Sequence, residues 1–215
     1  FTGLFDAGDV VGVGSPGYPS YRQILKALSL NTVTIKALSD NKFQPVPTDV
    51  MNNKLDGLLV ASPANPTGSM LNRDELEKLM AACKKKETAF ISDEIYHGIE
   101  YETRAVSALE VSDDCFVINS FSKYFSMTGW RLGWIVVPNK HIRQFERLAQ
   151  NMFICAPHIS QIAALGALDS YPELNQNVET YKTNRAMLTE QLPKLGLANF
   201  APPDGAFYFY VDVSE

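Results

Sequence analysis

The stretch from residue 118 to 137, INSFSKYFSMTGWRLGWIVV, places a single amine among hydroxyl groups between two apolar runs. Lys123 has one serine three residues before it, Ser120, and another directly before it, Ser122, and Arg131 follows eight residues later. Arginine and serine side chains suit a phosphate monoester, which they bind through charge-assisted hydrogen bonds. A lysine beside such an anion is free for covalent chemistry, and its characteristic covalent product is a Schiff base. The stretch therefore predicts an anion held beside a reactive amine.

The apolar runs on either side of the lysine belong to a set of runs that predicts an α/β sheet. Each run is short and nearly continuous in apolar residues, as in strands that are buried on both faces. About a dozen residues separate Asn119 from Leu132, whereas parallel neighbours usually need a helical crossover of at least that length. We therefore expect one antiparallel step in a mixed, mostly parallel sheet flanked by helices. The predicted strands are Leu55–Ala61, Thr88–Ile91, Phe116–Asn119 and Leu132–Val137.

Helical periodicity is clearest from Asn72 to Lys86, where apolar residues recur on one face. Asn72 can cap this helix, and Glu75 stands at the position that completes a capping box. Further helical patterns run over Lys140–Asn151, His158–Asp169 and Tyr171–Gln191. Near the end, the sequence GAFYFYVDV at residues 205–213 follows a turn and predicts an aromatic strand.

The composition limits the class of protein. The 215 residues carry a formal net charge of −5, and 46% of them are hydrophobic, which indicates a globular core and argues against a general nucleic-acid or anionic-membrane surface. Three cysteines without a close pair argue against a disulfide framework or a zinc cluster. No signal peptide is recognised and no apolar run approaches about 18 residues, so we expect a cytoplasmic protein. Because the chain begins without Met and ends directly after a strand-like run, we expect a piece of a larger protein.

Residues 12–17, GVGSPG, match the G-x-G-x-x-G pattern of dinucleotide-binding folds. In those folds the pattern opens a helix whose N-terminus holds pyrophosphate. Pro16 and Pro19 flank Gly17, and proline disfavours helix in the residue before it. We therefore interpret GVGSPG as a strand followed by a tight turn, and not as a dinucleotide site.

Four polar segments stand where strands are predicted to end, and loops at the carboxyl ends of parallel strands line the ligand crevice of such sheets. A phosphate and an aldehyde on one small molecule describe pyridoxal phosphate, whose pyridine nitrogen requires a carboxylate. Asp93 ends its apolar strand and suits this role. Asn65 and Tyr96 offer hydrogen bonds to the phenolic oxygen of the ring, and Tyr18 offers an aromatic face for stacking. The four segments are Ser15–Tyr21, Ser62–Gly68, Ser92–Tyr96 and the lysine stretch.

The ordered set SPANPTG, SDEIYHGIEY and INSFSKYFSMTGWRLGW resembles the class I/II aminotransferases, the fold-type I pyridoxal-phosphate enzymes. The likeness covers essentially the whole chain. It implies that Lys123 forms the Schiff base with the cofactor and that Asp93 pairs with the pyridinium. For the other candidates it implies hydrogen bonds to the phenolic oxygen from Tyr96 and Asn65, phosphate contacts from Ser120, Ser122 and Arg131, and an aromatic ring over the cofactor from Tyr18.

The resemblance also implies a domain organisation. Residues 1–190 would form most of the pyridoxal-phosphate-binding large domain, with a bridging helix near 171–191, and residues 192–215 would begin a small domain. The family's upstream phosphate-binding turn and its arginine for the substrate's α-carboxylate are then expected outside these residues, the arginine beyond Glu215. Family members are usually homodimers, and their sites are completed across the interface. We therefore expect the chain alone to lack parts that an active enzyme needs.

The implied reaction moves the amino group of an α-amino acid to a 2-oxo acid, with the freed amine of Lys123 as the general base. A carbon–sulfur β-lyase or an aminocyclopropane-carboxylate-synthase-like lyase would use the same lysine and aspartate. A non-catalytic domain that senses pyridoxal phosphate for a transcription regulator is a third alternative, and it would require a DNA-binding segment upstream. The sequence does not identify the amino acid or the keto acid.

Some neighbouring residues are given no part in the site. Asp93 is preferred to Glu94 because successive strand residues face opposite ways, and the resemblance selects the first. No metal is expected, since the three histidines lack metal-ligand spacing, and no role is assigned to His97, His141 or His158. Aromatic residues outside the polar segments are predicted to lie in the core, namely Trp130, Trp134 and the FYFY run at residues 207–210.

Overall fold

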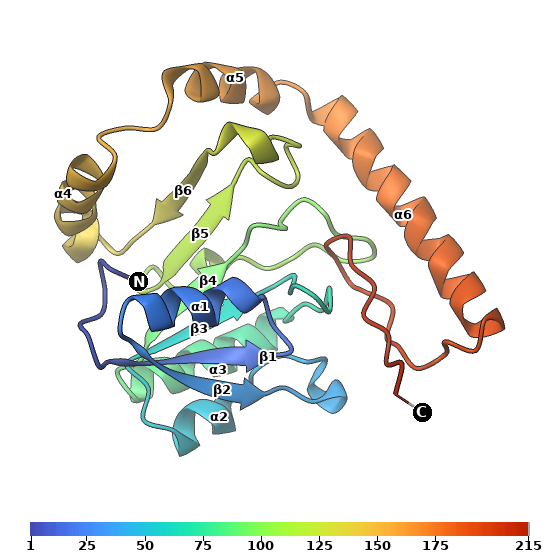
Figure 1. The fold of residues 1–215 in the computed structure, drawn as a ribbon, viewed down its shortest axis with the longest axis horizontal. Helices are drawn as coiled ribbons and strands as arrows, with labels where there is room; N and C mark the ends of the chain where they lie inside the picture. The colour runs from blue at the N-terminus through green and yellow to red at the C-terminus, as the bar shows by residue number, and fades with distance from the viewer. Residues whose placement is uncertain (215) are drawn as a thin grey trace.

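The computed structural model describes residues 1–214 as a six-stranded sheet with flanking helices (Figure 1). The strand order is β2-β1-β3-β4-β5-β6, in which β6 alone pairs antiparallel. This confirms the mixed, mostly parallel sheet and its predicted antiparallel step. The strands are β1 (Val10–Ser15), β2 (Asn31–Lys36), β3 (Gly57–Ala61), β4 (Ala89–Asp93), β5 (Phe116–Ser120) and β6 (Gly133–Val136). The helices are α1 (Pro19–Ala27), α2 (Pro47–Asn52), α3 (Arg73–Lys85), α4 (Ile142–Met152), α5 (His158–Leu168) and α6 (Tyr171–Lys194).

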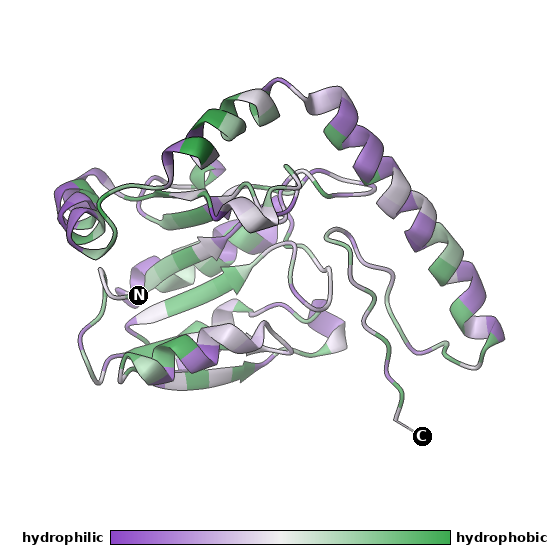
Figure 2. Cartoon of the chain, turned by 45° about the horizontal axis from the view of Figure 1, so that its top comes forward, coloured by the Kyte–Doolittle hydropathy of each residue, from purple (hydrophilic) through white to green (hydrophobic). Residues whose placement is uncertain are grey.

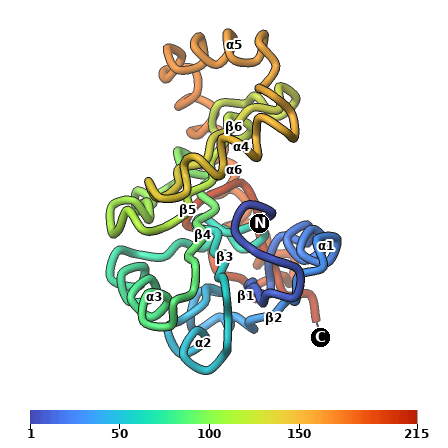
Figure 3. The backbone as a smooth tube through the Cα atoms, turned by 90° about the vertical axis from the view of Figure 1, so that its left-hand side faces the viewer, coloured from blue at the N-terminus to red at the C-terminus, as the bar shows by residue number. Residues whose placement is uncertain are grey.

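Consecutive residues of the central strands enter different hydrophobic clusters. Leu58 of β3 belongs to the cluster that contains Leu79 of α3, whereas the next residue, Leu59, belongs to the cluster that contains Leu25 of α1. In Figure 3 the strands lie between α1 on one side and α2 and α3 on the other. The central strands therefore bury both faces, which explains why they read as nearly continuous apolar runs.

Helix α3 begins with the capping box that the sequence predicts. The side chain of Asn72 accepts a hydrogen bond from the backbone N–H of Glu75 at 3.0 Å, and the Glu75 carboxylate accepts one from the backbone N–H of Asn72 at 2.8 Å. These two bonds satisfy N–H groups that have no partner inside the helix. The predicted apolar face is buried against the sheet and consists of Leu76, Leu79, Met80 and Cys83.

Helices α4, α5 and α6 form an arc outside the sheet (Figure 1). Hydrophilic residues dominate α6, whereas the central strands are hydrophobic (Figure 2). After α6 the chain returns to the carboxyl ends of the strands, where Gly205 donates a backbone hydrogen bond to Gly68 at 2.9 Å. We call residues 199–214 the C-terminal segment. No helix within residues 1–214 has the length and apolar character that a bilayer crossing requires.

The aromatic strand predicted over residues 205–213 does not form. The C-terminal segment makes two isolated antiparallel bridges instead, Glu100 with Gly205 and Phe200 with Val211. A strand needs a partner along its whole length, and each of these partners supplies a single residue.

The prediction that the aromatic residues lie in the core is also wrong. Trp130 is 43% exposed and Trp134 is 40% exposed. Trp134 lies on β6, an edge strand whose four residues are all exposed within the described chain, because no element covers it. In the FYFY run, Phe207 and Tyr210 are exposed and the two residues between them are half-buried.

The turn after β1 leads into a helix that the sequence analysis did not predict. Helix α1 starts at Pro19, where a missing N–H costs nothing because the first helical positions have no partner for it. Tyr18 is extended, as expected for a residue that precedes proline, and serves as the N-cap. The interpretation of GVGSPG as strand and turn is confirmed, since β1 ends at Ser15 and α1 begins only at Pro19. Strand β2 and the short helix α2 were not predicted either.

Candidate active site

Four parallel strands end at one edge of the sheet, and the loops that follow them carry most of the candidate residues. Ala61 of β3 pairs with Asp93 of β4, which in turn pairs with Ile118 of β5. These registers bring the segments after β3, β4 and β5 to the same edge, with Ser15 at the end of β1 nearby in the sheet order. Such an edge is where open α/β sheets bind ligands.

Asp93, the last residue of β4, accepts two hydrogen bonds. The Tyr21 hydroxyl donates to Oδ2 at 2.5 Å, and the backbone N–H of Ile95 donates to Oδ1 at 3.1 Å. Burial raises the pKa of Asp93 above its ordinary value, and the two hydrogen bonds oppose that rise. Burial and the nearby Asp93 charge both raise the pKa of Tyr21, so its hydroxyl remains a donor.

Tyr21 was not assigned a role from the sequence, although it lies in one of the quoted segments. It follows Tyr18 by three residues at the start of α1, a spacing that places two side chains next to each other on a helix. The two rings meet edge to face with centroids 5.4 Å apart. The Tyr18 ring is therefore connected to Asp93 through Tyr21, and it is 44% exposed.

The side chains of Asn65 and Tyr96 both hydrogen-bond to one phenolic oxygen, that of Tyr208. The amide nitrogen of Asn65 donates to the Tyr208 hydroxyl at 3.2 Å, and the hydroxyls of Tyr96 and Tyr208 are 2.7 Å apart. Burial and the Tyr208 contact raise the pKa of Tyr96, so its hydroxyl is protonated. Tyr208 belongs to the C-terminal segment and was not predicted, because 143 residues separate it from Asn65.

The Lys123 amine lies among aromatic rings. Its Nζ atom is 5.7 Å from the ring centroid of Tyr96 and 5.7 Å from that of Phe207. Within residues 1–214, no carboxylate lies within 4.0 Å of this amine. The lysine is half-buried on the turn after β5, where its carbonyl accepts a hydrogen bond from the backbone of Ser126.

The predicted phosphate anchors lie on the same turn but do not all meet. The Ser120 hydroxyl accepts a hydrogen bond from the backbone of Ser122 at 2.9 Å. Arg131 is exposed, has a left-handed φ of 54°, and donates to the Thr128 carbonyl at 2.8 Å. Among the described residues, no hydrogen bond joins the Arg131 guanidinium to Ser120 or Ser122.

The loop that carries Asn65 is fastened to the C-terminal segment. Gly68 has a φ of +66°, and a Cβ atom there would lie 2.3 Å from the Cβ atom of Pro203. Only glycine permits both this backbone conformation and this approach. The Asp204 carboxylate also accepts a hydrogen bond from the backbone of Met70 at 3.1 Å. These contacts keep the C-terminal segment, and Tyr208 with it, against the loop.

Residues 1–215 match the family described as aminotransferase class I and II. The chain belongs to this family. A valine–pyruvate aminotransferase of Mycobacterium tuberculosis is 43% identical over 100% of this chain and 57% of the relative. An aspartate aminotransferase of Sulfurisphaera tokodaii is 33% identical over 97% of this chain and 54% of the relative. The crystal structure of a candidate aminotransferase from Silicibacter pomeroyi has a TM-score of 0.98 and 61% identity, covering 100% of this chain and 58% of that one.

This class I and II aminotransferase chain therefore spans little more than half the length of the relatives it matches. Its α/β fold is the fold-type I fold that the resemblance implies, and the family uses pyridoxal phosphate. Three of the candidate residues, Asn65, Tyr96 and Lys123, lie close together. Asp93 contacts Tyr21, which was not predicted, and the Arg131 guanidinium hydrogen-bonds only within the turn that carries it, among the described residues.

Proposed function

We propose that the protein to which this chain belongs is a pyridoxal-phosphate-dependent aminotransferase that moves the amino group of an α-amino acid to a 2-oxo acid. Family membership and the names of the relatives support this reaction class. The observation that carries the proposal is the convergence of Asn65 and Tyr96 on one phenolic oxygen near the Lys123 amine.

That oxygen has the chemistry of the cofactor's own phenolic oxygen. In this structure it belongs to Tyr208, which accepts from the Asn65 amide and shares a hydrogen bond with the Tyr96 hydroxyl. These side chains therefore fit pyridoxal phosphate. An amide N–H and a phenol O–H can each donate a hydrogen bond to a phenolate oxygen, and such bonds stabilise its negative charge. The aromatic rings around Lys123 provide an apolar wall for a planar ligand.

When bound, pyridoxal phosphate supplies an electron sink for the negative charge that develops at the substrate's α carbon. The Lys123 amine would hold the cofactor through its aldehyde group, and as a free amine it would serve as the general base for the proton on the substrate's α carbon. The Asp93 carboxylate would pair with the protonated pyridine nitrogen, and the Tyr21 hydroxyl holds that carboxylate in place. The other proposed contacts are phosphate binding by Ser120, Ser122 and Arg131 and ring stacking by Tyr18.

We also propose that residues 1–190 form most of a large domain and residues 192–215 begin a small domain, and that the complete protein is a homodimer that works in the cytoplasm. Helix α6, which ends at Lys194, would bridge the two domains. The exposed apolar residues of β6 and α5 support an assembly with further protein surface.

The first test is a reduction experiment on the full-length protein. Pyridoxal phosphate is added, borohydride is used to reduce any Schiff base, and the modified lysine is located by peptide mapping. The proposal expects one phosphopyridoxyl group on Lys123 and none in Lys123→Arg, with Lys85→Arg as a matched control that keeps the modification. No modification of a folded wild-type protein, or modification only at other lysines, would contradict the proposal.

A second measurement separates the aminotransferase from the lyases. Amino acids, including valine and aspartate, are incubated with a 2-oxo acid, and the formation of the new amino acid is compared with the release of ammonia or thiol. Exchange of amino groups supports the proposal. Ammonia or thiol release without exchange would indicate a lyase, and cofactor binding with neither reaction would indicate a sensor domain.

A further inference from the structure

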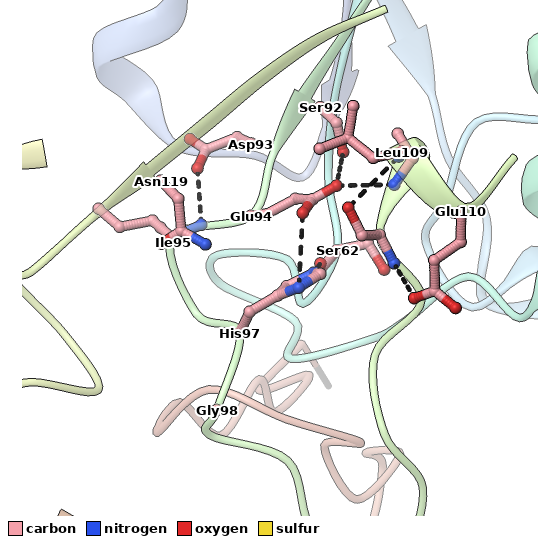
Figure 4. Close-up of polar contacts among 12 residues, drawn as sticks. Ser62, Ser92, Asp93, Glu94, Ile95, His97, Gly98, Leu109, Glu110 and Asn119 are labelled. Carbon is pink, nitrogen blue, oxygen red and sulfur yellow. Dashed lines mark hydrogen bonds and ion pairs between the residues drawn. The ribbon is translucent and has the colours of Figure 1, made fainter. Parts of the chain in front are cut away.

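A buried carboxylate and a half-buried imidazole, Glu94 and His97, meet next to the candidate residues Asp93 and Tyr96. Glu94, the residue after Asp93, is only 3% exposed. Its Oε1 atom accepts hydrogen bonds from the Ser92 hydroxyl at 3.0 Å and from the backbone N–H of Ala108 at 2.8 Å. Its Oε2 atom lies 3.5 Å from Nδ1 of His97 (Figure 4). Two donors therefore hold Oε1 in place, and Oε2 is left facing the imidazole.

His97 connects this carboxylate to the neighbouring strand end. Its other ring nitrogen, Nε2, lies 3.0 Å from the backbone carbonyl of Ser62. A carbonyl oxygen can only accept, so Nε2 carries a hydrogen. Nδ1 faces the Glu94 carboxylate, 3.5 Å from Oε2. The imidazole ring therefore bridges Glu94 and the backbone of Ser62.

The bridge links the two loops that carry the paired donors. Ser62 follows β3 and lies three residues before Asn65, while His97 follows Tyr96 directly. The backbone N–H of Ser62 donates to the Asp93 carbonyl at 3.3 Å, so both backbone polar groups of Ser62 have a partner on the segment around β4's end. A shift of the Ser62 carbonyl would move Asn65 relative to Tyr96.

We propose that His97 is a positioning residue for the cofactor site: held by Glu94, it fixes the loop of Asn65 against Tyr96 so that both side chains reach one phenolic oxygen. This inference rests on the proposed function. It also has an electrostatic part, since the Glu94 charge raises the pKa of Asp93 and the His97 charge lowers it.

The choice of substitution separates the two contacts of His97. A glutamine amide reaches about as far as Nε2, so His97→Gln retains the donor to Ser62 and loses the contact with Glu94. An asparagine amide reaches about as far as Nδ1, so His97→Asn retains the contact with Glu94 and loses that with Ser62. His158→Ala is the matched control, because this histidine is exposed at the start of α5.

The test measures the dissociation constant of pyridoxal phosphate from the full-length protein, together with the midpoint of urea unfolding without cofactor. We expect His97→Asn and His97→Ala to weaken cofactor binding by about tenfold, and His97→Gln by less than about threefold. In an Asn65→Ala background, His97→Ala should add less than about twofold, because the residue that it positions is already absent.

The outcomes distinguish this inference from the proposed function. If the wild-type protein does not bind the cofactor, the proposed function fails. If it binds and His97→Ala binds equally well, or if the His97→Ala effect is undiminished in the Asn65→Ala background, His97 does not position Asn65. Equal losses for His97→Gln and His97→Asn would likewise overturn the role of the Ser62 contact, whatever the unfolding midpoints show.

Discussion

At the scale of single residues, the site depends on side chains whose hydrogen-bond partners lie far away in the sequence. Asp93 could be selected from the sequence because it ends an apolar run and because the resemblance to the aminotransferases marks it in preference to Glu94. Its partner Tyr21, 72 residues earlier, could not be found in this way, since only the order of the strands brings α1 beside β4. His97 was given no role for the same reason, because its partners Glu94 and Ser62 lie on different strand ends.

The Tyr21–Asp93 hydrogen bond predicts a pH-dependent stability. Burial raises the folded pKa of Asp93 above its ordinary value of 3.8, so its ionisation costs stability as the pH rises from that value through the folded pKa. Tyr21→Phe removes a bond that opposes this shift, and we expect it to lower the free energy of unfolding by about 2 kcal/mol at neutral pH. The penalty should shrink below the ordinary value, where the carboxyl is protonated in both states.

Urea unfolding of the cofactor-free chain at several pH values measures this effect. Tyr18→Phe is the control, because the Tyr18 hydroxyl makes no hydrogen bond within residues 1–214. A Tyr21→Phe penalty that stayed constant with pH would contradict the assignment of Asp93 as the partner that ionises.

At the scale of elements, periodicity predicted the structures that bury a regular face. Four apolar runs became β3 to β6, and the capping box of α3 forms as expected. Strand β2, NTVTIK, was missed because it is an edge strand with a mostly exposed, polar sequence. Helix α1 was missed because prolines were taken as barriers, whereas Pro19 occupies the one helical position where proline is favoured.

Gly68 gives the sharpest prediction at this scale. Gly68→Ala should lower the free energy of unfolding by about 3 kcal/mol, since alanine adds both left-handed strain and a clash with Pro203. Gly196→Ala is the matched control, with a φ of +82° and no atom within 4 Å of the added Cβ, and it should cost about 1 kcal/mol. Denaturant unfolding of both variants gives the comparison. Equal costs would mean that the C-terminal segment does not press against the loop.

At the scale of the whole chain, apolar side chains are exposed on β6, the strand at one edge of the described sheet. Ile135 of β6 is 42% exposed and pairs with Ile118 of β5, which is 36% exposed. The free edge of β6 also offers unpaired backbone groups to another strand. The continuous apolar runs that identified the strands do not predict this exposure, because the exposure depends on which elements lie beside β6.

We therefore expect the isolated 215-residue chain to self-associate through β6. Ile135→Lys should reduce the association, because a charge on an edge strand opposes strand pairing. Light scattering over a range of protein concentrations measures it. Leu38→Lys, at a residue that is 61% exposed outside the sheet, should leave the association unchanged, and an equal effect of both variants would rule out β6 as the contact.

The two adjacent carboxylates at the end of β4, Asp93 and Glu94, point into different surroundings, and this has a consequence for insertions and deletions. Asp93 meets Tyr21 on one side, and Glu94 meets Ser92 and His97 on the other. Adding or removing one residue within β4 would exchange the two carboxylates between these environments, although the composition of the strand would hardly change. A change in the length of a surface loop need not affect these contacts, whereas a one-residue change in the length of β4 would alter which carboxylate faces Tyr21 and which faces His97.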